Sequence, residues 1–243
     1  MVNISESQVF YYPYPYILFK RIFSEYFYNH LKDEFPKINE LNFNTFDKKR
    51  NELKQSKYNL TNLDNNFYNI IKNKKFTFQL YNFLKSKTFI NNLIFFLNSK
   101  NLNINYNNKE SFHKKLIKRF ILKKIDFTFE FSAINTNGGF INPHTDGANK
   151  IITLIIPLID NPAIYKVTNC GTKILETYNE AYSYNFMNKT VPWELTKTIA
   201  EVPFLDNQMM MFIKTHNSLH SVGPMESLDN SLFRKSINFC ICG

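Results

Sequence analysis

The chain is poor in cysteine and glycine and contains no long apolar run. Of its 243 residues, three are cysteines and six are glycines. So few cysteines in a chain of this length do not make a disulfide framework. The longest apolar run, residues 151–159, is far shorter than the roughly 20 residues of a membrane-spanning helix. The first eight residues lack the basic and apolar regions of a signal peptide, so we expect a cytoplasmic protein with no membrane partner.

The sequence also lacks a second cysteine pair that would complete a zinc site with Cys240 and Cys242. A structural zinc site needs four ligands, and a single C-x-C pair supplies two. Both residues lie in an apolar C-terminal run. We therefore predict that they are small core residues.

Acidic residues are outnumbered by basic ones, 20 against 30, which gives a formal net charge of +10. A positive field favours acidic partners such as phosphates, carboxylates or nucleic acid. The one dense basic cluster comprises Lys114, Lys115, Lys118 and Arg119, on a predicted helix over about 112–120. Elsewhere the lysines are dispersed, which is typical of a solvated surface. We interpret the cluster in the same way, and nucleic-acid binding is disfavoured.

Hydrophobic residues make up 44% of the chain and aromatic residues 16%, so the chain is long and apolar enough to bury one substantial core. We predict one domain over 1–243, of the α+β class, with a mainly helical part at 1–124. Ser24 is expected to cap a helix that ends at Pro36, and further helices are expected at 76–84 and 89–97. Residues 40–72 show only weak helical patterning.

The pattern changes period near residue 125. Residues 125–133 alternate apolar and polar side chains, which predicts a half-buried strand. Residues 151–158 are almost all apolar and β-branched, which predicts a strand buried on both faces. Further short strands are expected at 172–175, 202–204, 208–213 and 236–242. The part at 125–243 is therefore predicted to be all-β.

A candidate metal site begins at His144 and Asp146. Because they are two residues apart, their side chains leave the same face of an extended backbone. An imidazole beside a carboxylate forms one edge of a metal site. The alternative is a surface turn built on Asp146 and Gly147, since a lone H-x-D occurs by chance in many proteins.

The C-terminal end supplies further candidates in His216, His220, Arg234 and Ser236. Two histidines and one carboxylate suit Fe(II), because they leave coordination positions open for O₂ and a cosubstrate. Opposite strands of a β-barrel can bring such distant residues to one cavity. Arg234 and Ser236 point the same way on a strand, and a guanidinium beside a hydroxyl can bind a carboxylate.

The order of these motifs resembles that of the Fe(II)/2-oxoglutarate-dependent oxygenases, especially the prolyl-hydroxylase-like branch. That order is H-x-D, a buried strand, a Gly-Thr turn, a distal histidine and Arg-x-Ser. The chain supplies these as His144 to Asp146, 151–158, Gly171-Thr172, His220, and Arg234 to Ser236. The resemblance covers about 127–242 well and the N-terminal part loosely. It favours His220 over His216 as the distal ligand, because the residues after His220 match the family.

The resemblance implies a double-stranded β-helix, or jelly-roll, core with flanking N-terminal helices. It implies that His144, Asp146 and His220 bind Fe(II). Arg234, helped by Ser236, would bind the distal carboxylate of 2-oxoglutarate, and Thr153 would line the cosubstrate pocket. The implied reaction consumes O₂, converts 2-oxoglutarate to succinate and CO₂, and hydroxylates a substrate. That substrate is a small molecule, a sugar or a protein side chain.

The chain departs from the family in two respects. Relatives often have tyrosines where this chain has about Ile134 and Pro157, a change that concerns the hydrogen bonds to 2-oxoglutarate and not the iron site. Leu219 stands where the family often has tryptophan. Asp146 is present where halogenating relatives have glycine or alanine, so halogenation is not expected.

Two other functions remain open at this point. One is a non-catalytic basic β-barrel that binds an acidic partner, and the other is a cupin-like metalloenzyme that does not use 2-oxoglutarate. Arg234 and Ser236 discriminate against the second, because such an enzyme needs no carboxylate clamp. Residues 179–193 are rich in tyrosine and asparagine, and form either a lid over the substrate or a surface loop.

Overall fold

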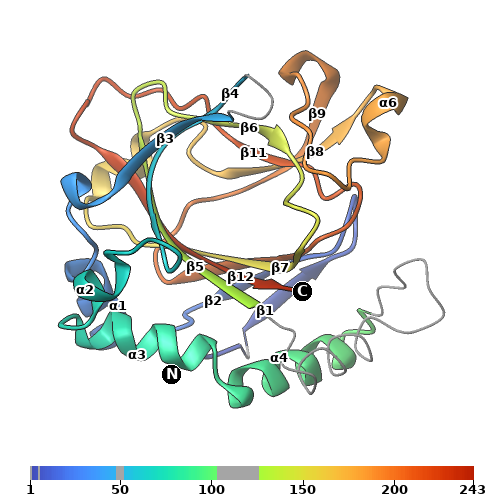
Figure 1. Cartoon of the computed structure of the whole chain (residues 1–243). Coiled ribbons are helices and arrows are strands. Elements are labelled where there is room, and N and C mark those ends of the chain that lie inside the picture. Colours follow the sequence, from blue (N-terminus) through green and yellow to red (C-terminus); the bar gives the residue numbers. More distant parts are fainter. Residues whose placement is uncertain (1, 5, 48–51, 103–125) are drawn as a thin grey trace.

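The computed structural model describes residues 2–4, 6–47, 52–102 and 126–243 (Figure 1). In this part of the chain twelve strands form one sheet, and every strand pairs antiparallel with its neighbours. The strands are β1 (Ser7–Phe10), β2 (Tyr16–Lys20), β3 (Asn42–Asp47), β4 (Glu52–Thr61), β5 (Asp126–Asn135), β6 (Ile141–His144), β7 (Lys150–Pro157), β8 (Thr172–Thr177), β9 (Thr196–Val202), β10 (Gln208–Ile213), β11 (His220–Val222) and β12 (Phe233–Cys242). The helices are α1 (Glu25–Asp33), α2 (Phe67–Ile71), α3 (Lys75–Leu84), α4 (Lys87–Ser99) and α6 (Glu180–Ser183), with 3₁₀ turns η1 (Ile38–Glu40), η2 (Pro162–Lys166) and η3 (Trp193–Leu195).

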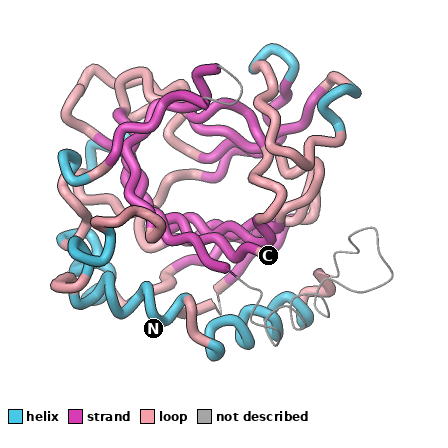
Figure 2. The backbone as a smooth tube through the Cα atoms, viewed as in Figure 1, coloured by secondary structure: helices cyan, strands magenta, loops and turns pink. Residues whose placement is uncertain are grey.

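The sheet curls until two layers of strands face each other across a barrel interior (Figure 2). Its strand order is β1-β2-β10-β7-β12-β5-β4-β6-β11-β8-β9, with β3 paired to β4. Strand β4 joins the layers, because its residues 58–61 pair with β5 while Gln55 pairs with Ile141 of β6. The jelly-roll core with flanking N-terminal helices is confirmed. No helix among the described residues is long and apolar enough to cross a membrane.

Helices α1, α3 and α4 cover the outer face of the layer that contains β5, β12 and β7 (Figure 1). Helix α1 begins as predicted, with the Ser24 hydroxyl accepting the Phe27 N–H at 3.3 Å. The rings of Phe35 and Phe131 lie 5.4 Å apart edge to face. This aromatic packing buries the outward side chains of the strands and forms the largest apolar cluster of the described chain.

The inner face of the same strands is polar. The side-chain period of two turns Glu130 and Ser132 of β5 towards the interior, along with Ser236 and Asn238 of β12. The register confirms this arrangement, since Asn238 pairs with Glu130 and Ser236 with Ser132. The barrel thus has an apolar outside under the helices and a polar inside.

Two local predictions were wrong. The weakly helical pattern over 40–72 is a β-hairpin of β3 and β4, and only α2 is helical there. Pairing of β4 with β5 decides its conformation, and such a long-range contact overrides local propensity. The strand predicted at 202–204 ends at Val202, because Pro203 has no N–H to continue the ladder.

The predicted helices at 76–84 and 89–97 are present as α3 and α4. Cys240 and Cys242 are buried and unpaired, as the sequence predicts. The predicted basic helix at 112–120 lies outside the described residues.

Candidate metal centre

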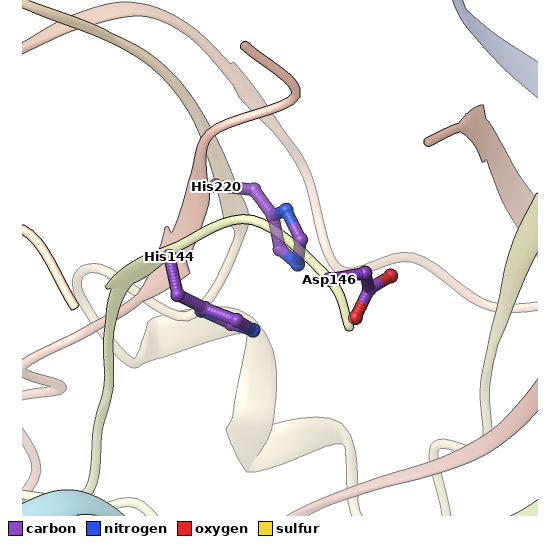
Figure 3. A group of neighbouring side chains, drawn as sticks. All are labelled: His144, Asp146 and His220. Atoms are coloured by element: carbon purple, nitrogen blue, oxygen red, sulfur yellow. The ribbon is translucent and has the colours of Figure 1, made fainter. Parts of the chain in front are cut away.

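Three predicted ligands meet where β6 and β11 pair. His144 ends β6, His220 begins β11, and the two residues are direct partners across the ladder. Asp146 follows two residues after His144. The ligand atoms of the three side chains all lie within 4.8 Å of one another, and the side chains converge on one point (Figure 3). His216 does not belong to this group, and its ring stacks on Tyr184 instead.

Both histidines are oriented by their own backbone. The Nδ1 of His144 lies 2.8 Å from the carbonyl of Asn142, and the Nδ1 of His220 lies 3.0 Å from the carbonyl of Ser218. A carbonyl only accepts, so each Nδ1 carries a hydrogen, and in the neutral ring the lone pair is then on Nε2. A second hydrogen bond of this kind fixes the tautomer of a metal-binding histidine.

Asp146 is held as a carboxylate. Burial alone would raise its pKa, but Lys150, together with His220 and His144, outweighs burial and holds the pKa well below its ordinary value. The Lys150 ammonium lies 2.7 Å from Oδ1, and the Thr153 hydroxyl donates to Oδ2 at 2.6 Å. Asp146 is therefore ionised at neutral pH, as a ligand must be.

His220 is neutral at the same pH. Burial lowers its pKa by more than the nearby Asp146 carboxylate raises it. With His144 the site offers two imidazoles and one carboxylate on one side of a shared point. This donor set fits Fe(II) with coordination positions left open, so the residues present are suited to the metal that the resemblance implies.

Arg234 lies in the wall of the same cavity, which has a volume of about 180 Å³. Its side chain is 3% exposed. Nε donates to the Cys170 carbonyl at 2.8 Å, Nη2 donates to the Thr172 hydroxyl at 3.2 Å, and the guanidinium lies over the Phe204 ring. No acidic side chain of the described residues forms an ion pair with it. A buried cation without a counter-ion is unfavourable, and an anion bound beside Arg234 would remove this cost.

The other two predicted cosubstrate residues lie differently. Thr153 lines the cavity, but its hydroxyl is bonded to Asp146. Ser236 is 1% exposed, donates to the Asn238 side-chain oxygen at 3.1 Å, and is not among the residues that line the cavity. A role for Ser236 beside Arg234 stays a prediction.

Sequence reasoning missed several charged and polar residues of the cavity. Lys57 of β4 forms an ion pair with Glu130 of β5 at 2.7 Å, and the Asn238 amide donates to the same carboxylate at 3.0 Å. The period-two pattern of β5 and β12 places Glu130 and Asn238 on the inner face, so that signal was present. No sequence signal marked Lys57, because its strand was not predicted. Lys150 had no motif to mark it either.

No family model matches this sequence, and no curated protein matches it. Among solved structures, the chain is similar to a prolyl hydroxylase from Trichoplax adhaerens in complex with a peptide fragment of the oxygen degradation domain of hypoxia inducible factor. The TM-score is 0.51 at 10% identity, and the alignment covers 93% of this chain and 83% of that one. This likeness confirms the expected resemblance at the level of the fold.

Two further structures align less closely. A Pseudomonas putida prolyl-4-hydroxylase gives a TM-score of 0.45 at 11% identity, over 93% of this chain and 91% of that one. A 2OG-Fe(II) oxygenase family oxidoreductase from Burkholderia pseudomallei gives 0.44 at 10% identity, over 88% and 76%. These two alignments are too loose to carry an argument about function.

Proposed function

We propose that this protein is an Fe(II)- and 2-oxoglutarate-dependent dioxygenase that hydroxylates an organic substrate. One observation carries the proposal. The buried Arg234, without an acidic partner among the described residues, shares a cavity with the cluster of His144, Asp146 and His220. A site for a metal and a site for an anion in one cavity suit a cosubstrate that has a chelating end and a distal carboxylate.

The ligand residues would hold Fe(II) on one side and leave the other side for the cosubstrate and O₂. Bound iron and 2-oxoglutarate would supply the activation of O₂, with oxidative decarboxylation to succinate and CO₂. The protein supplies the geometry. Lys150 and Thr153 fix both oxygens of Asp146, and backbone carbonyls fix both imidazole rings.

Arg234 would bind the distal carboxylate of 2-oxoglutarate. A guanidinium has five N–H donors, and two of them are committed to Cys170 and Thr172. The remaining donors bond to no described residue of the chain, and would make charge-assisted hydrogen bonds to a carboxylate. The Phe204 ring, 4.2 Å from the guanidinium carbon, keeps the fork in one orientation.

The two alternatives fit less well. A non-catalytic binding module does not require two histidines with fixed tautomers beside an ionised, buried carboxylate. A cupin-like enzyme that does not use 2-oxoglutarate has no use for a buried Arg234 facing the metal cavity. The substrate class is not fixed by these residues, so small molecules, sugars and protein side chains all belong to the proposal.

Anaerobic titration of the Fe(II)-loaded protein with 2-oxoglutarate tests the proposal. We expect the weak visible charge-transfer band of an iron-bound 2-oxo acid in the wild type and no band in His220→Ala. Arg234→Met should weaken 2-oxoglutarate binding about tenfold or more, because it removes charged hydrogen bonds. Lys235→Met is the matched control, since Lys235 is the next residue of β12 and pairs with Asp160.

Two outcomes contradict the proposed function, and a third contradicts the role of Arg234 alone. A folded wild type that binds Fe(II) but shows no band with 2-oxoglutarate would support the cupin-like alternative. A folded wild type that binds no Fe(II) would support the binding module. Equal loss of 2-oxoglutarate affinity in Arg234→Met and Lys235→Met would remove the role given to Arg234.

A further inference from the structure

Residues 179–193, called the strap here, follow β8, include α6 and end at the first residue of η3; Figure 1 shows this part of the chain between β8 and β9. No residue of the strap is among the described residues that line the metal cavity. Tyr182, Ser183 and Asn185 line a separate pocket of about 220 Å³ instead, together with Thr145 and His216. The strap therefore lies beside the segments that carry the ligands and is not a wall of the cavity.

The strap is bonded to the two residues just before His144. The Trp193 indole N–H donates to the side-chain oxygen of Asn142 at 2.9 Å. The Val191 N–H donates to the Pro143 carbonyl at 2.8 Å. Because the Asn142 carbonyl also fixes Nδ1 of His144, the Trp193 bond holds the residue that sets the tautomer of this ligand.

The strap is bonded just after His144 as well, through Asn185. Thr145, which separates the two ligands of the H-x-D motif, donates its hydroxyl to the Asn185 carbonyl. The Asn185 N–H donates to the His216 carbonyl at 2.8 Å, in the loop that leads to His220. These two bonds join the segment of His144 to the segment of His220 through the backbone of Asn185. Asn185 is 3% exposed.

The side chain of Asn185 keeps that backbone in place. Its amide donates to the Lys189 carbonyl at 2.7 Å, and its oxygen accepts the Lys189 N–H at 2.7 Å. These two bonds join the first and last residues of the 185–189 loop and fix its shape. Val191 then packs in an apolar cluster with Leu219, the neighbour of His220.

We infer that the strap is a brace that positions His144 and His220 for metal binding, and that Asn185 is its central positioning residue. The inference rests on the proposed function. Groups that orient metal ligands from behind change metal affinity by about 10–100-fold when they are removed. The strap reaches the residues on both sides of one ligand and the loop before the other, so loosening it should lower affinity without removing any ligand.

The strap offers a matched control. Asn179 is also an asparagine of the strap, but its side-chain oxygen only accepts the Ala181 N–H at 2.9 Å, at the start of α6. Asn179→Ala therefore removes only the cap of α6. Asn185→Ala removes the two side-chain bonds to Lys189 that hold the backbone between the His144 and His220 segments. Asn185→Asp is a conservative variant, since it keeps an acceptor for the Lys189 N–H and loses the amide donor.

The experiment is an absorption titration of each metal-free protein with Co(II), with the thermal midpoint of each metal-free protein measured alongside. Asn185→Ala should raise the Co(II) dissociation constant about tenfold. Asn179→Ala should change it less than about twofold, and Asn185→Asp should fall between them. Trp193→Phe keeps an aromatic ring but loses the indole hydrogen bond to Asn142, so it should raise the constant about threefold.

The outcomes separate the two proposals. If the wild type binds Co(II) and both Asn185→Asp and Trp193→Phe bind it equally well, the brace is wrong while the proposed function stands. If the wild type binds no Co(II), the proposed function fails and the brace fails with it. If Asn185→Ala does not fold, the two conservative variants decide the question. A loss of affinity in Asn179→Ala equal to that in Asn185→Ala would also contradict the brace.

Discussion

Strands β5 and β12 present two unlike faces on opposite sides of one sheet. The face under the helices carries Phe129, Phe131, Ile237 and Phe239, all fully buried. The face inside the barrel carries Glu130, Ser132, Arg234, Ser236 and Asn238. Successive residues of one strand thus have different roles. Those on the outer face bury apolar surface, and those on the inner face line a polar interior.

The difference shows how this jelly-roll separates stability from chemistry. Burial of large aromatic side chains stabilises the fold in proportion to the apolar area removed from water. The inner face instead keeps charged groups away from water, which is unfavourable unless each has a partner. Loss of a large side chain on the outer face should therefore lower the free energy of unfolding most. Substitutions on the inner face should lower it less, and chiefly where a buried charge loses its partner.

The largest effect on stability is expected from Phe131→Ala on the outer face. Phe131 is fully buried and contacts the rings of Phe35 and Phe67, so its loss leaves a cavity. We expect a loss of about 3–5 kcal/mol in the free energy of unfolding, measured by urea denaturation. Ser132→Ala, the next residue and on the inner face, is the control and should change it by less than about 1 kcal/mol. Equal losses would erase the distinction between the faces.

A smaller loss is expected from Glu130→Gln, which leaves Lys57 without its counter-ion. The side chains are 16% and 11% exposed, so we expect about 2 kcal/mol at pH 7, below the range for fully buried pairs. Burial raises the pKa of Glu130, but Lys57 outweighs it and the pKa lies below its ordinary value of 4.5. A lowered pKa adds stability above pH 4.5 that is lost as the pH falls through the folded-state pKa.

The difference between wild type and Glu130→Gln should therefore shrink as the pH falls below 4.5 and through the lowered folded-state pKa of Glu130. Denaturation curves at pH 7 and at lower pH measure it. The double variant Lys57→Met/Glu130→Gln should recover part of the loss, because no unpaired charge remains. A difference that is the same at all pH values would show that the pair contributes through shape and not through charge.

The smallest effect concerns Cys240, which faces the barrel interior beside Thr153 at 3.6 Å. Burial raises the pKa of its thiol to about 11. At pH 8 only about one thiol in a thousand is then ionised, and the thiolate is the reactive form. Native metal-free protein should resist iodoacetamide at Cys240, and the unfolded chain should react at all three cysteines. Rapid labelling of native Cys240, measured by mass spectrometry, would mean that the inner face is open to water.

The sequence predicted the elements whose pattern is local. The alternation in β5 and the β-branched run of β7 identified both strands, and the capping Ser24 located α1. The hairpin of β3 and β4 was not predicted, because β4 is stabilised by pairing with β5, and β3 by pairing with β4, and not by their own pattern. The length of β9 was missed for a similar reason, since its residues face solvent more than core.

The candidate site divides in the same way. His144, Asp146, His220 and Arg234 were identified by the order of short motifs, which survives in the sequence without knowledge of the fold. Lys57 and Lys150 carry no motif, and only the folded chain shows that they face acidic partners in the cavity. The sequence did not decide whether residues 179–193 form a lid or a surface loop, because hydrogen bonds to Asn142, Pro143 and Thr145 have no signature in a single sequence.

Iron held by His144, Asp146 and His220 is proposed to bind the same 2-oxoglutarate molecule as Arg234. The most direct test is the Fe(II) affinity with and without 2-oxoglutarate under anaerobic conditions. If Fe(II) and 2-oxoglutarate bind in contact with each other, each must strengthen the binding of the other by the same factor. We predict that 2-oxoglutarate tightens Fe(II) binding about tenfold or more in the wild type, and that Arg234→Met needs an about tenfold higher 2-oxoglutarate concentration for the same effect. Fe(II) affinity that is unchanged by 2-oxoglutarate in the wild type would contradict the account.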